Sequence, residues 1–282
     1  MPLERAGPAR RHTGGQRPHW SMTAHDDQHS GMLLDMAGAG RHRHAPWENG
    51  GHMGGLTGDP AFAATTFVVI DFEATTPTGF PAQPIEVAAL ALRYETGTWT
   101  TAGRPFSSLI RPPAFAPVTP ADTAQTGLTA EQVGQAPSPA EALGALDRRF
   151  AAGKPYLLVA QHAATEANLI HNQREHCPAL ARIDLLDTIP LARYLFPGLP
   201  NYRLDTLLAH FSIKHPADRH RAYADVEVTA EVFMRLVGAA DENAELSDLA
   251  ALVKIAGRTA KCNMPAQGEL FDVHPTSERG HG

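Results

Sequence analysis

Apolar runs bounded by turn residues begin at residue 65 and continue to about residue 238. The first of them, TTFVVID at 65–71, is rich in β-branched residues and follows a Gly-Asp-Pro turn, which is typical of a buried strand. Two further runs, at 85–94 and 105–111, are separated by Gly- and Pro-containing turns that suit antiparallel neighbours. The pattern therefore predicts an antiparallel meander of three strands at the start of the fold.

Strands alternate with helices in the second half of the chain. Short apolar runs at 156–160 and 183–188 predict two more strands, which brings the sheet to five. Helical spacing of apolar residues predicts helices over 140–152, 163–176, 189–195, 202–211, 221–238 and 246–255. Because such alternation is typical of strands joined through helices, we expect an α/β fold with a mixed five-stranded sheet flanked by helices.

The two ends of the chain show no such pattern. Residues 1–63 are crowded with Gly, His, Pro and Arg and have no sustained period, which predicts a disordered leader or an over-extended N-terminus from an upstream start. The seven histidines in this segment are irregularly spaced and have no cysteine among them, so a flexible tail is favoured over a metal site. The predicted organisation is a leader over 1–63, a folded domain over 64–238, and a short helix with a flexible tail over 239–282.

Composition narrows the functional class. The 282 residues are 43% hydrophobic, which is enough for a buried core and excludes wholesale disorder. The net charge of −6 argues against a generally basic nucleic-acid coat, while local patches and metal-bridged phosphate contacts stay open. Two cysteines exclude a disulfide framework and a four-thiolate zinc site, and they fit a reduced, cytoplasmic setting. No apolar run approaches the roughly 20 residues that span a bilayer, so we expect a soluble protein with no membrane partner.

Two carboxylates close the first predicted strand. Asp71 and Glu73 are two residues apart, so the alternation of a strand places both side chains on one face of the sheet. Each negative charge raises the free-energy cost of ionising the other, and a divalent cation would relieve that repulsion. Because an Asp-x-Glu pair is common, a solvated turn or a helix cap is an alternative interpretation of the pair taken alone.

Two later segments add acidic groups and a histidine. Glu166 is expected in the first turn of the helix after the strand at 156–160, where it points back toward the strand ends; an exposed first-turn Glu is the alternative. His220 precedes Asp225 by five residues, a spacing that separates side chains on a helix by about 140°. The two residues can therefore share a site only if His220 lies on the preceding loop. Taken alone, His220 is also explained as a surface residue and Asp225 as an acid that complements a helix dipole.

Three segments carry these residues in order: VVIDFEATTP with Asp71 and Glu73, LVAQHAATEANLI with Glu166, and HRAYADVEVTAEVF with His220 and Asp225. Over about 65–240 they resemble the DEDDh family of 3′–5′ exonucleases, which includes the proofreading epsilon subunit of bacterial DNA polymerase III, ribonuclease T and oligoribonuclease. The resemblance implies a ribonuclease H-like fold. It also implies a hydrolase of DNA replication or repair that releases nucleoside 5′-monophosphates from the 3′ ends of single-stranded DNA or RNA.

The resemblance further implies a role for each residue. Two divalent cations, Mg²⁺ or Mn²⁺, would be held by four carboxylates: Asp71, Glu73, Glu166 and Asp225. His220 would act as general base on the attacking water, because a histidine ordinarily titrates near neutral pH. Contacts to the terminal nucleotides would come from four residues near the motifs: Ala74, Thr75, Leu128 and His162. Four basic residues are candidates for the phosphate backbone, with simple solvent exposure as the alternative: Arg203, Lys214, Arg219 and Arg221.

The second motif departs from the family pattern. It normally reads His-Asn-x-x-Phe-Asp, and residues 161–166 read Gln-His-Ala-Ala-Thr-Glu. The extra methylene of Glu166 moves the carboxylate by on the order of 1.5 Å, in a geometry that catalysis holds to within roughly 0.5 Å. This change predicts reduced activity or an altered metal preference. The alternative to an active enzyme is a catalytically impaired nucleic-acid-binding module.

The C-terminal tail adds a candidate partner. Gln267, Leu270 and Phe271 resemble the Q-x-x-L-F pentapeptide by which bacterial replication and repair proteins dock on the sliding clamp. A disordered peptide with two apolar anchors suits such a pocket, although Gly268 departs from the usual pattern and short motifs also arise by chance. A polymerase- or clamp-associated accessory factor is therefore a third interpretation.

Overall fold

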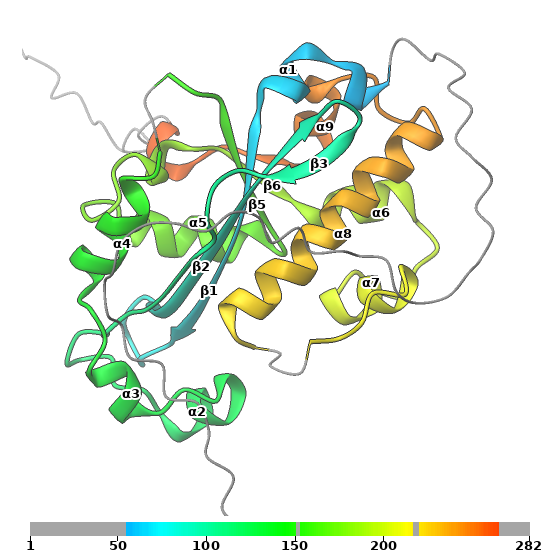
Figure 1. The fold of residues 1–282 in the computed structure, drawn as a ribbon. Coiled ribbons are helices and arrows are strands. Elements are labelled where there is room, and N and C mark those ends of the chain that lie inside the picture. Colours follow the sequence, from blue (N-terminus) through cyan, green and yellow to red (C-terminus); the bar gives the residue numbers. More distant parts are fainter. Residues whose placement is uncertain (1–54, 151–152, 217–219, 265–282) are drawn as a thin grey trace, which may run out of the picture. The chain divides into compact units, whose positions relative to one another are not determined.

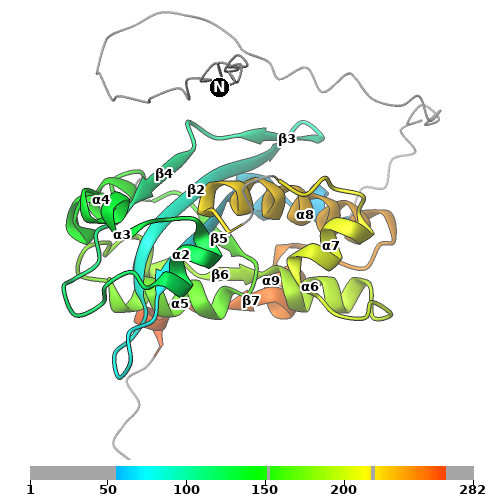
Figure 2. The same ribbon diagram turned by 90° about the horizontal axis from the view of Figure 1, so that it is seen from below.

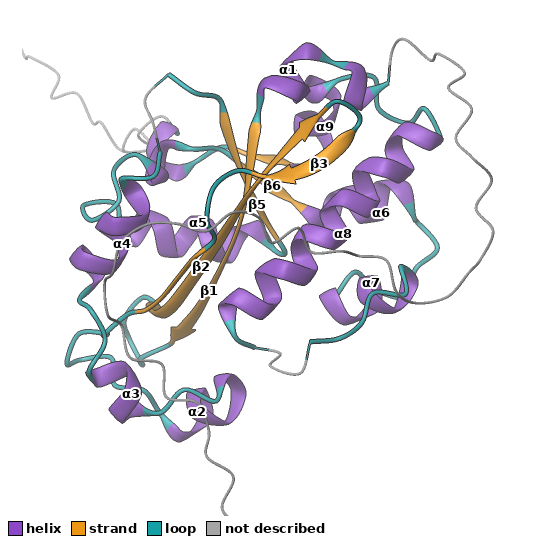
Figure 3. Cartoon of the chain, in the orientation of Figure 1, coloured by secondary structure: helices purple, strands orange, loops and turns teal. Residues whose placement is uncertain are grey.

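The computed structural model describes residues 55–150, 153–216 and 220–264. Its centre is a mixed sheet of seven strands with helices on both faces (Figure 1; Figure 3). The strands are β1 (Thr66–Thr75), β2 (Gln83–Glu95), β3 (Thr98–Thr101), β4 (Phe106–Leu109), β5 (Tyr156–Ala160), β6 (Leu185–Asp187) and β7 (Gly257–Arg258). Their order is β3-β2-β1-β5-β6-β7, and β4 also pairs with β2. Since β1 is antiparallel to β2 and parallel to β5, the predicted mixed α/β sheet is confirmed.

Six of the α-helices lie close to positions that the sequence predicts, whereas three short ones, at 60–64, 120–126 and 130–134, are not predicted. The α-helices of the described residues are α1 (Pro60–Ala64), α2 (Pro120–Thr126), α3 (Ala130–Gly134), α4 (Pro139–Asp147), α5 (Ala163–Asn172), α6 (Thr188–Leu195), α7 (Leu204–His210), α8 (Ala222–Glu242) and α9 (Leu249–Ala256). Short 3₁₀ helices are η1 (Leu56–Gly58), η2 (Leu180–Arg182) and η3 (Lys261–Asn263). Across these ranges, no helix is both long enough and apolar enough to cross a bilayer.

Alternation of side chains along β1 gives the sheet two different buried faces. Phe67 and Val69 join the core that contains the apolar residues of α8, whereas Val68 joins the core beneath α4 and α5. α5 and α8 are seen on opposite sides of the sheet in Figure 2. The face of Phe67 and Val69 continues to Asp71 and Glu73, so both acidic residues of β1 lie on the side of α8.

The sheet has two short strands more than the five that the sequence predicts. The third predicted strand, 105–111, is only the four-residue β4, and it shares one edge of β2 with the separate strand β3. The two-residue β7 pairs with β6 at the other edge of the sheet. Runs of two to four residues are too short for a recognisable alternation, which is why the sequence pattern misses them.

The N-terminal boundary of the fold also differs from the prediction. The leader expected over 1–63 includes η1 and most of α1, whose residues Leu56 and Phe62 have no exposed surface. The ring of Phe62 lies 4.8 Å from that of Phe67, centroid to centroid, and Asp59 caps α1 by accepting the N–H of Ala61 at 2.9 Å. This segment is too short for a helical period, so the signals for a helix in its sequence are the capping residue Asp59 and Pro60. The rest of the predicted leader and the clamp-like motif at 267–271 lie outside the described residues.

Candidate active site

The last part of β1 carries the first two acidic side chains. Glu73 is buried, with 7% of its surface exposed, and Asp71 is half-buried. β5 pairs with β1 only as far as Val69 opposite Val159, so the last six residues of β1 extend beyond this neighbour. The first turn of α5 follows β5 directly and can therefore approach the two acids from that side.

Asp187, at the end of β6, fixes the start of α5. Its carboxylate accepts the N–H groups of His162 at 3.3 Å and Ala163 at 3.0 Å, and it also accepts the N–H of Ile189 at 2.9 Å in the first turn of α6. His162 has a left-handed backbone with φ of 70°, which is uncommon for a residue with a side chain. One buried acid thus caps two helices and sets the position of the residues that follow in α5.

Glu166 lies in this first turn of α5 and is almost completely buried, with 3% of its surface exposed. Burial is the main cause that raises the pKa of Glu166 to about 8, and the negative charges of Asp187 and Glu73 add to it. Its Oε2 atom has no hydrogen-bond partner among the described residues. A carboxylate that is buried, unsatisfied and close to other acids is the environment that a bound cation would stabilise.

Glu73 comes together with the third predicted segment. One ligand atom each of Glu73, His220 and Asp225 lies within 4.8 Å of the other two. Asp225 is buried in the first turn of α8, whereas His220 is exposed and precedes the helix with a left-handed φ of 63°. His220 is therefore outside the helix, as its five-residue spacing from Asp225 requires. Among the described residues, Asp71 and Glu166 lie outside this group of three.

A buried acid outside the three sequence motifs holds the start of α8. Glu86 is 2% exposed and lies directly opposite Glu73 in the β1–β2 ladder. It accepts hydrogen bonds from Arg221 Nε at 3.0 Å, from Arg221 Nη2 at 2.8 Å and from the backbone N–H of Ala222 at 3.1 Å. The only signal in the sequence is a Glu inside the apolar run PIEVAAL. Arg221, a candidate for contact with the phosphate backbone, binds Glu86 and still keeps 41% of its side-chain surface exposed.

The predicted nucleotide contacts have mixed positions. The side chain of Thr75 has no exposed surface, and its hydroxyl donates to Asp122 Oδ2 at 2.9 Å. Leu128 is 2% exposed and packs with Ile85 and Val133. Neither side chain is therefore available to a nucleotide in this structure. The other two predicted contacts, half-buried Ala74 and exposed His162, keep surface that a ligand can reach.

The altered second motif has structural partners. Gln161, where the family has His, donates from Nε2 to the carbonyl of Tyr202 at 2.8 Å and accepts the hydroxyl of Thr188. His162 Nδ1 lies 2.9 Å from Thr165 Oγ1. These contacts tie the turn between β5 and α5 to the start of α6 and to the segment before α7. Of the predicted basic contacts, Arg203 and Lys214 are exposed and Arg219 lies outside the described residues.

The model of the ribonuclease T protein family, which is described as an exonuclease family, matches residues 68–233, more than half of the chain. The chain belongs to this exonuclease family. The DNA polymerase III subunit epsilon of Aquifex aeolicus is 34% identical over 175 residues, which cover 61% of this chain and 80% of the relative. A DNA polymerase III subunit epsilon-like protein of Rhodobacter capsulatus is 32% identical over 191 residues, and a PolC-type DNA polymerase III of Caldanaerobacter subterraneus is 30% identical over 171 residues. These matches span 66% and 61% of this exonuclease-family chain but only 26% and 11% of the relatives.

Solved structures of exonucleases share the fold of this family member. The nuclease domain of 3′hExo, described as a DEDDh family member bound to rAMP, has a TM-score of 0.52 and 19% identity, with 65% of this chain and 96% of that domain covered. Exonuclease I of E. coli in complex with a dT13 oligonucleotide has a TM-score of 0.53 and 18% identity, with 64% of this chain and 42% of the other covered. At these identities the likeness concerns the fold.

Proposed function

We propose that this chain is a metal-dependent 3′–5′ exonuclease that releases nucleoside 5′-monophosphates from single-stranded DNA or RNA ends. The observation that carries the proposal is the group of Glu73, His220 and Asp225, within 4.8 Å of one another in a chain of the exonuclease family. An imidazole and oxygen ligands in one place suit phosphodiester hydrolysis, because they provide a base and an anionic pocket for cations that neutralise the phosphate.

The residues present fit divalent cations. The buried Oε2 of Glu166 has no partner among the described residues, and the pKa of Glu166 is raised to about 8 by burial and neighbouring negative charge. A hard cation would satisfy this oxygen and remove the repulsion, and Mg²⁺ or Mn²⁺ prefers carboxylate oxygens. The residues that would hold such cations are Asp71, Glu73, Glu166 and Asp225. When bound, a pair of them stabilises the charge that develops on the phosphate and on the leaving oxygen.

The exposure of His220 beside two carboxylates supports its proposed role as general base. His220 is exposed, and the next residue, Arg221, is held by two hydrogen bonds from its guanidinium to Glu86. As water oxygen forms its bond to phosphorus, a ring nitrogen of His220 takes the water proton. The bond from phosphorus to the 3′ oxygen breaks, and that oxygen takes a proton from solvent. The products are a nucleoside 5′-monophosphate and a shortened strand with a 3′ hydroxyl, and His220 returns its proton to solvent.

A catalytically impaired nucleic-acid-binding module is the second candidate. One observation favours it, because Glu166 is buried beside the group of three rather than within it. In this alternative the chain binds single strands without turnover, and replacing Glu166 with the Asp of the family pattern produces no gain in cleavage.

The partners follow from the relatives. Several are named as DNA polymerase III subunits or polymerases, so a 3′ end presented during DNA replication is the substrate context that we propose. Docking on a sliding clamp through Gln267, Leu270 and Phe271 belongs to the same proposal, although these residues lie outside the described part of the chain. Binding of a peptide covering 265–274 to a purified clamp tests this docking. The control is the same peptide with Leu270→Ala and Phe271→Ala together. Equal binding of the original and the substituted peptide would exclude the docking proposal.

The direction of cleavage tests the main proposal. The full chain is incubated with a single-stranded oligonucleotide labelled at its 5′ end, with Mg²⁺, with Mn²⁺ or with a chelator. We expect a descending ladder of labelled products with either metal and none with the chelator. A label released at once as a mononucleotide would indicate the opposite polarity, and an intact oligonucleotide that is nevertheless bound would favour the impaired module.

A further inference from the structure

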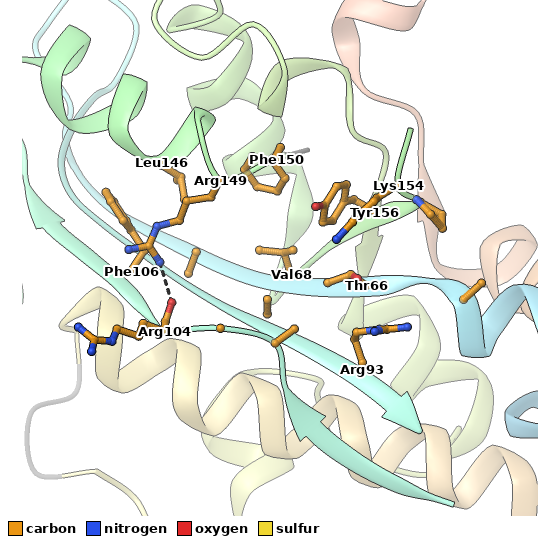
Figure 4. Close-up of a pocket in the computed structure, with 16 residues that line it drawn as sticks. Thr66, Val68, Arg93, Arg104, Phe106, Leu146, Arg149, Phe150, Lys154 and Tyr156 are labelled. Atoms are coloured by element: carbon orange, nitrogen blue, oxygen red, sulfur yellow. Dashed lines mark hydrogen bonds between the residues drawn. The ribbon is translucent and has the colours of Figure 1, made fainter. Parts of the chain in front are cut away.

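A cavity of about 490 Å³ lies between the sheet and Leu146 of α4, and none of its lining residues belongs to the acidic group. Figure 4 shows the residues that line it. Its floor is formed by Val68 of β1 with Ala89 and Ala91 of β2, which are neighbours on one face of the sheet. The two alanines leave the space open, because a larger side chain at either position would fill it. Leu146 in the last turn of α4 and Phe150 just after this helix contribute to the wall.

The charged residues that line this cavity are all basic. Among the residues that line it, four are basic and none is acidic: Arg93, Arg104, Arg149 and Lys154. The whole chain has a net charge of −6, and residues 64–238 contain only 14 Lys and Arg. Gathering four of them around one cavity in an acidic protein produces a local positive potential that attracts anions.

Two of the four cations, Arg149 and Arg93, are held in place by contacts with neighbouring groups. Arg149 donates from Nη1 to the carbonyl of Arg104 at 2.6 Å, and its guanidinium lies over the ring of Phe106 at 4.8 Å, as Figure 4 shows. Arg93 Nη1 pairs with Glu95 at 2.7 Å, while its Nε is buried and has no hydrogen-bond partner among the described residues. A buried donor without a partner is unfavourable, and an acceptor oxygen of a ligand would satisfy it once a movement of the Arg93 side chain exposes this atom.

Aromatic side chains line the same cavity. Phe106, Phe150 and Tyr156 all contribute to it, and the rings of Phe150 and Tyr156 pack edge to face at 5.2 Å. Arginine forks suit phosphate oxygens, and aromatic rings suit the flat face of a base. The cavity volume is also within the roughly 300–1,000 Å³ of small-molecule sites.

We propose that this cavity is a second binding site, which takes a nucleotide through its phosphate and its base. The nucleotide is either free or part of a nucleic-acid strand, since both present the same groups. Val68 and Glu73 are five residues apart along β1, which corresponds to about 17 Å, and they point to opposite faces of the sheet. The cavity is therefore separate from the acidic group, and its occupation requires no divalent cation.

Binding to the full chain in a chelator tests this proposal, because cleavage and metal-dependent binding at the acidic group are then silent. The probes are AMP, adenosine and a dT12 oligonucleotide, and titration calorimetry measures the binding of each. We expect AMP to bind at least tenfold more tightly than adenosine. A nucleotide within a strand is the occupant if dT12 binds and AMP does not.

Three variants identify the site. Arg149→Met with Lys154→Met removes two charges, and Ala91→Leu fills the floor without changing the charge. Both variants are expected to lower the affinity for the probe at least tenfold. The control, Arg174→Met with Arg235→Met, changes two exposed cations outside the cavity and should leave this affinity unchanged. Thermal unfolding confirms that each variant is folded. The proposal is overturned if neither AMP nor dT12 binds the original chain. It is also overturned if both cavity variants bind the probe with the affinity of the original chain. Metal-dependent cleavage is measured separately in every variant, so that a failure of the proposed function is distinguished from a failure of this site.

Discussion

Glu86 of β2 accepts two hydrogen bonds from the guanidinium of Arg221, at 3.0 and 2.8 Å, and so ties the sheet to the residue that follows His220. The same carboxylate accepts the N–H of Ala222 at the start of α8. Because Glu86 also lies opposite Glu73 in the ladder, one buried acid links the strand and the helix that carry Glu73 and Asp225. We regard Glu86 as a positioning residue for the acidic group.

Replacing Glu86 with Gln tests this role. The amide keeps the shape and loses the charge-assisted hydrogen bonds, so the free energy of unfolding is expected to fall by about 1.5–3 kcal/mol. Since a displacement of about 1 Å can cost 100-fold in rate, kcat is expected to fall roughly 10- to 100-fold, with KM changed less than threefold. Glu131→Gln, at an exposed helix position, is the matched control. An unchanged kcat with lowered stability would limit Glu86 to a purely structural role.

The buried carboxyl of Glu166 makes the metal-free protein sensitive to pH. Burial and the nearby charges raise its pKa from the ordinary value of 4.5 to about 8. The folded protein therefore holds a proton that the unfolded chain has lost, and stability falls as pH rises between these two values. The difference amounts to at most roughly 4–5 kcal/mol, from about 1.4 kcal/mol per pKa unit.

Thermal unfolding in a chelator from pH 5 to pH 8.5 measures this effect. We expect Tm to fall with rising pH in the original chain and to be much flatter in Glu166→Gln. Mg²⁺ is expected to raise Tm more at pH 8 than at pH 6, because a proton on Glu166 competes with the cation. Parallel curves for the two proteins would show that Glu166 does not titrate in this range.

The replacement of the family Asp by Glu166 leads to a separate prediction about catalysis. If Glu166 contributes to the cation site, Glu166→Gln lowers kcat by at least 100-fold, because the amide has no negative charge. Glu166→Asp keeps the charge, and we expect its kcat to stay within tenfold of the original in either direction. Steady-state rates with Mg²⁺ and with Mn²⁺ measure both variants, and full activity of Glu166→Gln would exclude Glu166 as a ligand.

Phe62 is expected to be essential for stability although it precedes the predicted domain. Its ring has no exposed surface and packs against Phe67 and Trp99. Phe62→Ala should lower the free energy of unfolding by about 3–5 kcal/mol, as for large-to-small changes in a core. Phe80 is 55% exposed, so Phe80→Ala should cost much less. Denaturant unfolding compares them, and equal losses would contradict the packing described for α1.

The sequence predicts the elements with a strong local signal and misses those that depend on distant partners. β5 is found at the predicted residues because its apolar run is bounded by turns, and α8 because its apolar stripe repeats over several turns. η1 and α1 are too short to show a period, although Leu56 and Phe62 are fully buried. Local patterning therefore predicts most of the longer helices and strands and their order along the chain.

The same limit applies to the site. Asp71, Glu73, Glu166, His220 and Asp225 are selected from motif order, and the structure brings Glu73, His220 and Asp225 into one group. The contact between Glu86 and Arg221 joins residues 135 positions apart, and no local pattern reveals it. The basic cavity is equally invisible, because its lining residues come from segments far apart in the sequence, from β1 and β2 to Arg149 and Lys154.

Cleavage of a 5′-labelled single strand by matched variants tests the central claim most directly. Asp225→Asn removes one charge from the acidic group, and Glu175→Gln removes one from an acid whose side chain is 79% exposed. With Mg²⁺ or Mn²⁺, we expect a descending ladder from the original chain and from Glu175→Gln, and at least a 100-fold slower ladder from folded Asp225→Asn. Equal ladders from Asp225→Asn and Glu175→Gln would contradict the assignment of this group as the exonuclease site.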